Sequence, residues 1–139
     1  MQDKAIVEFK QEGPITVGRI LTASVLDARN VDQFVEELLD YVKGHPGIHL
    51  VLDFGRVTYF SSAVLGGLVR ALKAVATDNG SMRLCGLAPM IRELFEITNL
   101  DKAFIIEKDV KTALTRFERS LQVTAEDEAW QKSRKGRES

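Results

Sequence analysis

Apolar positions along the chain repeat with two different spacings, and these spacings predict an alternation of strands and helices. Short runs that are continuously or alternately apolar predict strands over residues 5–9, 15–21, 48–54, 82–85 and 104–106. Apolar positions three and four residues apart predict helices over residues 34–42, 61–75, 89–95 and 110–121. The predicted element order is therefore β-β-α-β-α-β-α-β-α.

That order predicts an α/β domain. The turn signal Gly13-Pro14 separates the first two strands, which predicts a hairpin or two neighbouring strands. The alternation that follows is typical of parallel strands joined by crossover helices. The run from Ile48 to Phe54 is apolar on both faces apart from His49, as in a central strand covered by helices. We therefore expect a mixed, mostly parallel sheet of about five strands with four helices.

The chain changes character after Leu121. The predicted fourth helix has an inward-facing stripe made of Val110, Ala113, Leu114, Phe117 and Leu121. Residues 122–139 instead mix both charges around a single Trp130 and lack a periodic apolar face. We therefore place one domain at residues 1–121 and predict that residues 122–139 form a charged C-terminal segment, either a mobile tail or a helical extension.

Composition and charge narrow the class of protein. The 139 residues are 45% hydrophobic, which is enough for one core, and the single Cys85 rules out an internal disulfide. The formal net charge of −1 gives no basic field for nucleic acid. The charged N-terminus lacks the apolar core of a signal peptide, and no apolar run approaches the length of a membrane span. We expect a soluble cytoplasmic protein with no direct membrane insertion.

Motifs of catalytic and cofactor-binding sites are missing from the sequence. It has no Gly-rich phosphate loop with a lysine, and no GxGxxG follows a predicted strand. His45 and His49 have no third ligand nearby, which predicts that they hold no metal. Cys85 lies in a short apolar strand, as a small buried hydrophobe does, rather than a reactive thiol. We therefore predict a protein that is not an enzyme and carries no cofactor.

The segment from Asp53 to Leu65 carries the strongest functional signal. A buried strand ends at Asp53, and after a short loop Ser61 and Ser62 open an amphipathic helix. A hydroxyl at a helix start can accept hydrogen bonds from free backbone N–H groups, and a phosphate there would be stabilised by the helix dipole. This pattern favours a phosphorylation switch or a docking surface.

Other local signals concern the helices. Asn30 and Gln33 have the spacing of a capping box at the start of the first helix. Gly66 and Gly67 each cost a helix roughly 1 kcal/mol relative to alanine, which predicts a close approach by another backbone, in this domain or in a partner. Pro89 suits the first turn of the third helix. The apolar face predicted for that helix consists of Met90, Ile91, Leu94 and Phe95.

Three segments resemble the STAS domain, the fold of anti-sigma factor antagonists and of the cytoplasmic ends of sulfate transporters. Leu26-Asp27 resembles the Leu-Asp that ends the family's second strand region. Ser61-Ser62-Ala63-Val64-Leu65 resembles the family motif Asp-Ser-Ser-Gly-Leu, and residues 86–104 resemble the segment between the family's fourth and fifth strands. The resemblance covers roughly residues 5–120 and implies a STAS-like domain of the anti-sigma factor antagonist branch.

The resemblance implies a protein-binding module that acts in signal transduction and transcription regulation. In the antagonist branch, a serine kinase that is also the anti-sigma factor binds the unphosphorylated protein and phosphorylates the first serine of the pair. A phosphatase resets the switch, and ATP and magnesium belong to the kinase. By position the phosphoacceptor is Ser61, with Ser62 as the second choice. The residues expected to contact the partner are Asp27, Asn30, Phe60, Ser62, Val64 and Leu65.

Two positions depart from the family pattern. Phe60 stands where aspartate is usual, and Ala63 stands where glycine is usual. Tyr59 and Phe60 are either core aromatics or part of an exposed docking patch. Two main hypotheses stay open: an antagonist switched at Ser61, or a non-phosphorylated STAS scaffold subunit of a signalling particle or a lipid-transport ATPase complex. A third, a small-molecule-binding or catalytic domain, has no polar constellation in the sequence to support it. The oligomeric state is open as well, and a homodimer is one of the options.

Overall fold

The computed structural model describes residues 5–21 and 25–138, with Val25 and residues 131–138 described by their backbone alone. Five strands form the main sheet: β1 (Val7–Glu12), β2 (Ile15–Ile20), β4 (His49–Asp53), β6 (Ser81–Cys85) and β7 (Ile105–Glu107). Two short strands, β3 (Val25–Leu26) and β5 (Tyr59–Phe60), pair separately. The helices are α1 (Val31–Lys43), α2 (Ser62–Thr77), α3 (Pro89–Ile97), the 3₁₀ turn η1 (Leu100–Lys102) and α4 (Val110–Glu138).

The main sheet has the strand order β1-β2-β4-β6-β7. β1 and β2 form an antiparallel hairpin whose turn contains Gly13 at a positive φ of 63°. Every other neighbouring pair in this sheet is parallel, and β4 lies at its centre. The predicted α/β class, the mixed and mostly parallel five-stranded sheet and the four helices are confirmed.

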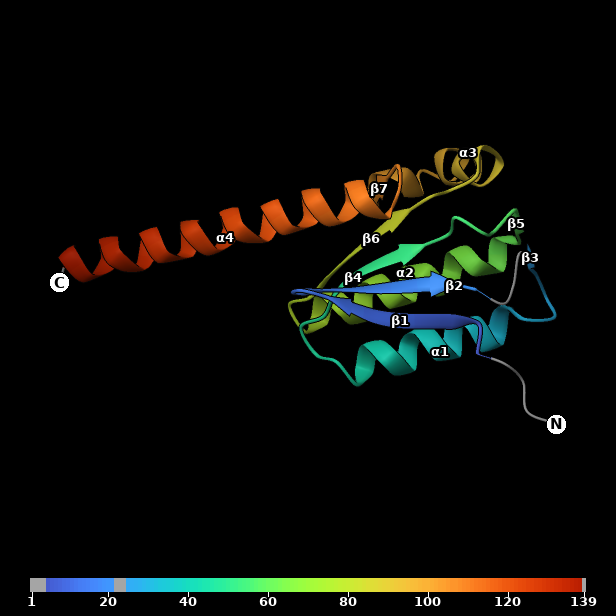
Figure 1. Cartoon of the computed structure of the whole chain (residues 1–139), viewed down its shortest axis with the longest axis horizontal. Coiled ribbons are helices and arrows are strands. Elements are labelled where there is room, and N and C mark those ends of the chain that lie inside the picture. The colour runs from blue at the N-terminus through green and yellow to red at the C-terminus, as the bar shows by residue number, and fades with distance from the viewer. Residues whose placement is uncertain (1–4, 22–24, 139) are drawn as a thin grey trace.

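Helices α1 and α2 lie on one face of the sheet (Figure 1), and the larger core between them and the sheet also includes Ile91 and Phe95 of α3. Leu50 and Leu52 of β4 point into this core, where they pack with Phe34 of α1, Leu68 of α2 and Phe95 of α3. Val51, between the two leucines, points to the opposite face. β4 is therefore apolar at successive positions because both of its faces are buried, as the sequence predicted.

Helix α4 covers the opposite face. Ala113 and Phe117 are buried against Ile15, Val51 and Cys85, and Val110, Leu114 and Leu121 pack around this smaller cluster. The predicted inward stripe of the fourth helix is thus confirmed. Beyond Leu121 the helical backbone continues to Glu138, and residues 122–130 are exposed. Figure 1 shows this C-terminal part of α4 projecting past the sheet.

The glycine pair Gly66-Gly67 was predicted to admit another backbone, but in this domain Gly67 is approached by a side chain. A β-carbon on Gly67 would collide with the side chain of Val35 on α1. A β-carbon on Gly66 would meet no atom of the described chain within 4 Å. Gly67 therefore allows α1 and α2 to pack, whereas packing inside the domain does not account for Gly66.

Candidate functional site

The candidate site lies where the parallel strands end. The parallel strands β2, β4 and β6 end at the same edge of the sheet, and open α/β sheets bind their ligands outside the carboxyl ends of such strands. β3 pairs in parallel with β5, which aligns Leu26 with Phe60. The Ser61 N–H donates to the Leu26 carbonyl at 2.8 Å. This pairing brings the Leu-Asp segment and the Ser-Ser segment together beside the first turn of α2 (Figure 1).

Ser61 is the N-cap residue of α2, as predicted, but its side chain makes no capping hydrogen bond. Its backbone is extended, with φ −83° and ψ 163°, and its carbonyl accepts from the Val64 N–H at 3.0 Å. The Ser61 Oγ is buried and has no hydrogen-bond partner among the described residues. A buried hydroxyl without a partner is uncommon and destabilising. Ser61 thus holds a polar group that contributes nothing evident to the fold.

Asp27 precedes α1 with its carboxylate held by Arg29. The Arg29 Nη2 donates to the Asp27 Oδ2 at 2.8 Å, and the Arg29 N–H donates to the Asp27 Oδ1 at 3.0 Å. The side-chain hydrogen bond from Arg29 is the main cause that lowers the pKa of Asp27 below its ordinary value, and the backbone N–H adds to it. Asp27 therefore carries a full negative charge near Ser61 at neutral pH.

Asn30 occupies the N-cap position of α1 without making the predicted capping bond. Its Oδ1 instead accepts from the Asp27 N–H at 2.9 Å, while the Asp27 carbonyl accepts from the Val31 N–H at 2.9 Å. The Asn30 side chain therefore fixes the loop that carries Asp27, and the capping-box prediction is wrong in this respect.

Three residues expected on the docking surface are buried. The Phe60 ring packs against Phe54 and Phe95, with ring centroids 6.0 Å away in each case, and Val64 and Leu65 also lie in the larger core. These side chains face inward because they attach the start of α2 to the sheet. Of the expected contact residues on α2, Ser62 is exposed. Tyr59 and Phe60 were expected to be either both core aromatics or part of a docking patch; the structure buries the Phe60 ring and exposes the Tyr59 ring.

Tyr59 and Met90 line an apolar hollow that the sequence did not identify. Tyr59 is 49% exposed and Met90 is 69% exposed. They border a cavity of about 260 Å³, together with Phe60, Ser62, Ile91 and Leu94. The sequence assigned Met90 to the buried face of α3, but only Ile91 and Phe95 of this helix are fully buried. The hollow joins two segments that are 30 residues apart in sequence, so no local pattern signals it.

Burial shifts the pKa of two further groups, Cys85 and His49. Burial raises the pKa of the Cys85 thiol to about 12, with Asp53 and Asp109 adding to the effect, so Cys85 is the predicted inert buried residue. Burial also lowers the pKa of His49, whose Nδ1 lies 2.9 Å from the Ser81 Oγ. Within the described ranges, no three His, Cys, Asp or Glu side chains gather as a metal site would require. No helix in the same ranges combines the length and apolar character needed to cross a bilayer.

Comparison with known proteins agrees with this architecture. The family model of the STAS domain matches residues 8–113. The chain is 34% identical over 98 residues to BtrV of Bordetella bronchiseptica, whose name describes a candidate anti-sigma factor antagonist, and this match covers 70% of the chain and 83% of BtrV.

Solved structures share the fold. An anti-sigma-factor antagonist (STAS) domain protein from Planctomyces limnophilus superposes with a TM-score of 0.75 at 23% identity, covering 81% of this chain and 97% of that one. The Bacillus cell fate determinant SpoIIAA in its phosphorylated form superposes with a TM-score of 0.59 at 17% identity, covering 79% and 97%. With a family model that matches most of its length, this chain belongs to the STAS domain family.

Proposed function

We propose that this protein is an anti-sigma factor antagonist that binds a serine kinase acting as anti-sigma factor, and that phosphorylation of Ser61 releases it. The names of its relatives support antagonist function, and one structural neighbour is a phosphorylated protein. The observation that carries the proposal is the Ser61 hydroxyl, which sits at the start of α2 without a hydrogen bond. In this proposal the chain is a binding module, and the kinase and a separate phosphatase do the chemistry.

The Ser61 hydroxyl can reach a kinase at small cost. It points inward, so it must rotate about χ1 to meet the phosphate donor. Because no hydrogen bond holds it among the described residues, the rotation breaks none. The phosphate then stands at the N-terminus of a helix of 16 residues, where free N–H groups and the helix dipole favour an anion. The domain therefore keeps its fold when it is phosphorylated.

Release follows from the charge added to the docking surface. A phosphate contributes about −1.5 to −2 charges at neutral pH, close to the ionised Asp27. Any acidic or apolar partner group that rested on this surface is repelled or left poorly solvated. We assign the polar part of the surface to Asp27, Asn30 and Ser62, and its apolar part to the hollow beside Tyr59 and Met90. The buried Phe60, Val64 and Leu65 support this surface from below.

The test uses the full chain and the histidine-kinase-type ATPase encoded nearest to its gene. We expect radiolabelled ATP to phosphorylate the wild type and Ser62→Ala but not Ser61→Ala. We also expect Ser61→Asp to bind the unreactive kinase at least tenfold more weakly than the wild type, whereas Ser62→Asp retains more of the affinity. Equal labelling of the wild type and Ser61→Ala would mean that the phosphoacceptor is a different residue. Unchanged affinity of Ser61→Asp for the kinase would reject the switch.

The scaffold hypothesis has one observation in its favour. Phe60 takes the place of the usual acidic residue and is buried between Phe54 and Phe95, so no carboxylate stands directly before the serine. Under this hypothesis the protein stays in a larger STAS assembly and is not phosphorylated. Phosphosite mass spectrometry on protein recovered from its own cells separates the two hypotheses, because only the switch predicts phosphate on Ser61 that changes with growth condition.

A further inference from the structure

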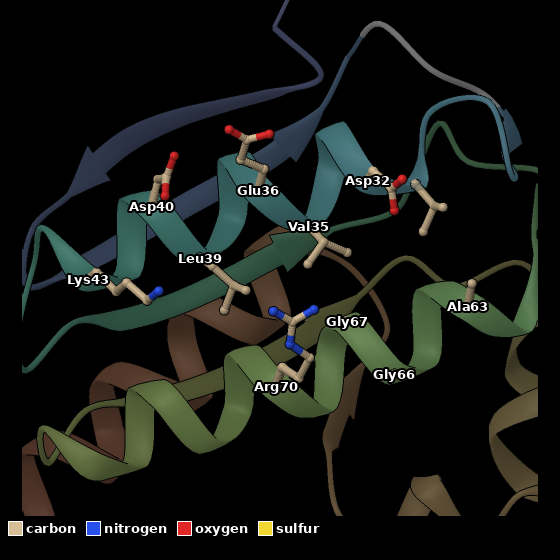
Figure 2. A pocket seen from close by; sticks show the side chains of 11 residues that line it. Asp32, Val35, Glu36, Leu39, Asp40, Lys43, Ala63, Gly66, Gly67 and Arg70 are labelled. Carbon is tan, nitrogen blue, oxygen red and sulfur yellow. The ribbon is translucent and has the colours of Figure 1, made fainter.

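A groove runs between α1 and α2 on the outer side of the domain. It encloses about 500 Å³, and the side chains of Val35 and Leu39 point into it from α1 (Figure 2). On the facing side of α2 the groove is lined by Ala63 and the two glycines that follow it in the next turn. Small residues on one wall let a third helix approach the backbone of α2 closely.

The α1 side of this groove is acidic. Asp32, Glu36 and Asp40 stand on successive turns of α1 (Figure 2). None of these carboxylates forms an ion pair with a basic group in the described ranges. Two cations also line the groove: Lys43 near the end of α1, and Arg70 on α2. Carboxylates therefore line α1 from Asp32 to Asp40, and Lys43 follows at its end. Figure 2 shows the Arg70 side chain reaching toward the middle of the groove.

Gly66 gives an independent reason to expect an occupant. Glycine within a helix costs roughly 1 kcal/mol relative to alanine. Gly67 offsets this cost by admitting Val35, but a β-carbon on Gly66 would meet nothing within 4 Å. A helix bound in the groove would explain Gly66, because the absence of a side chain there would let the bound helix pass close to the backbone of α2.

The C-terminal part of α4 has the complementary character. Residues 122–130 are exposed, and two apolar side chains lie one heptad apart on the same side of the helix: Val123, 49% exposed, and Trp130, 63% exposed. The acidic run Glu126-Asp127-Glu128 is followed by four basic residues, Lys132, Arg134, Lys135 and Arg137. Residues 122–130 of this segment are exposed, and a helix without tertiary packing is marginal in water, so docking would stabilise it.

We propose that the groove between α1 and α2 binds the C-terminal part of α4 from a second copy of this chain. The chain's own α4 cannot fill the groove, because α4 packs on the opposite face of the sheet and projects away from the domain (Figure 1). Residues 122–138 span roughly 25 Å as a helix, and the 13 residues of α1 span roughly 20 Å, so the segment is long enough to follow the groove along α1.

The charges also assign a direction to the bound helix. Its basic end lies beside Asp32 and Glu36, and its acidic run lies toward Lys43 at the end of α1. The bound helix therefore runs antiparallel to α1, an arrangement that the helix dipoles favour as well. Val123 and Trp130 supply the apolar contact with Val35 and Leu39.

Sedimentation velocity of the full chain over a wide concentration range tests this inference. We expect a dimer at low salt that dissociates on dilution and as salt rises. Glu36→Arg in the groove and Arg134→Glu on the helix should each weaken the dimer roughly fivefold to tenfold. Combining them should restore much of the affinity, because the two charges exchange places. Glu8→Arg makes the same charge change on β1 outside the groove and should leave the dimer intact.

A steric variant makes the test independent of charge. Gly66→Leu adds a side chain where the monomer has open space, so the monomer should fold normally while the dimer is lost. A monomer at every concentration would overturn the inference, as would a dimer unaffected by Glu36→Arg and Gly66→Leu. Binding of anionic vesicles by a monomer, lost in Arg134→Glu, would also overturn it by assigning the basic segment to a membrane surface. None of these outcomes bears on phosphorylation of Ser61.

Discussion

The side chain of Val35 on α1 occupies the space that a β-carbon on Gly67 of α2 would need. Its neighbour Gly66 lies on the open side of the same helix, where a β-carbon would meet nothing within 4 Å. Two adjacent glycines therefore have opposite relationships to the fold. One is required by the packing of two helices, and the other leaves a bare surface at the groove between them.

This difference predicts opposite effects of the same substitution. Gly67→Ala should lower the free energy of unfolding by about 1–3 kcal/mol, because the stiff β-branched Val35 must move. Gly66→Ala should raise it by up to about 1 kcal/mol, because it adds helix propensity without a clash. Urea denaturation at low protein concentration measures both. Loss of stability in Gly66→Ala would contradict the open environment of that position.

Ser61→Ala should not destabilise the protein. Replacing a capping serine by alanine ordinarily costs about 1 kcal/mol, but the Ser61 hydroxyl makes no capping bond and is buried without a partner. Removing an unsatisfied hydroxyl is neutral or stabilising. Chemical denaturation should therefore give an unfolding free energy equal to or above that of the wild type. A loss of about 1 kcal/mol would mean that the hydroxyl caps α2 in solution.

The Asp27 carboxyl should titrate below its ordinary pKa because of Arg29. The folded state favours the ionised form, so the stabilisation is fully present above the pKa of the unfolded chain and is lost as pH falls through the lower folded pKa. Carbon-detected NMR titration of the side chain measures this shift directly. In Arg29→Gln the Asp27 pKa should return toward its ordinary value, whereas Arg56→Gln, a control in the loop after β4, should leave it unchanged.

The carboxylate of Glu107, at the end of β7, forms ion pairs with two arginines that differ in burial. Its buried side chain lies 3.2 Å from Arg83 Nη1 and 3.3 Å from Arg116 Nη1. Arg83 is nearly buried and also lies over the Phe117 ring, with its Cζ 4.7 Å from the centroid, whereas Arg116 is 68% exposed. Arg83→Ala should cost about 3–5 kcal/mol, because it leaves a buried charge poorly compensated. Arg116→Ala should cost less than about 1 kcal/mol. Equal losses in thermal or chemical denaturation would contradict this assignment.

Local periodicity predicted the five strands of the main sheet and the four α-helices because it reports burial directly, but it missed the two-residue strands β3 and β5, which are too short to show a period. The stripe of α4 that includes Ala113 and Phe117 is buried as predicted, and β4 is apolar at successive positions because helices cover both of its faces. The prediction that Met90 belongs to the buried face of α3 was wrong. Met90 is apolar and lies next to the buried Ile91, but successive side chains of a helix point in different directions, and Met90 is 69% exposed beside the hollow while Ile91 enters the core. A pattern in sequence cannot locate the edge of a core that distant segments form.

The sequence by itself determined the fold class, the order of the five main-sheet strands and the four α-helices, and the position of Ser61 at the start of α2, because these depend on residue spacing within a few turns of chain. Only the tertiary structure decided which side chains face outward there. The pairing of β3 with β5 placed Asp27 beside the Ser61 segment, and the rings of Phe54 and Phe95 drew Phe60 into the core. The direction of the Ser61 hydroxyl, the hollow beside Tyr59 and the groove between α1 and α2 all depend on contacts between residues far apart in the chain, which no local pattern records.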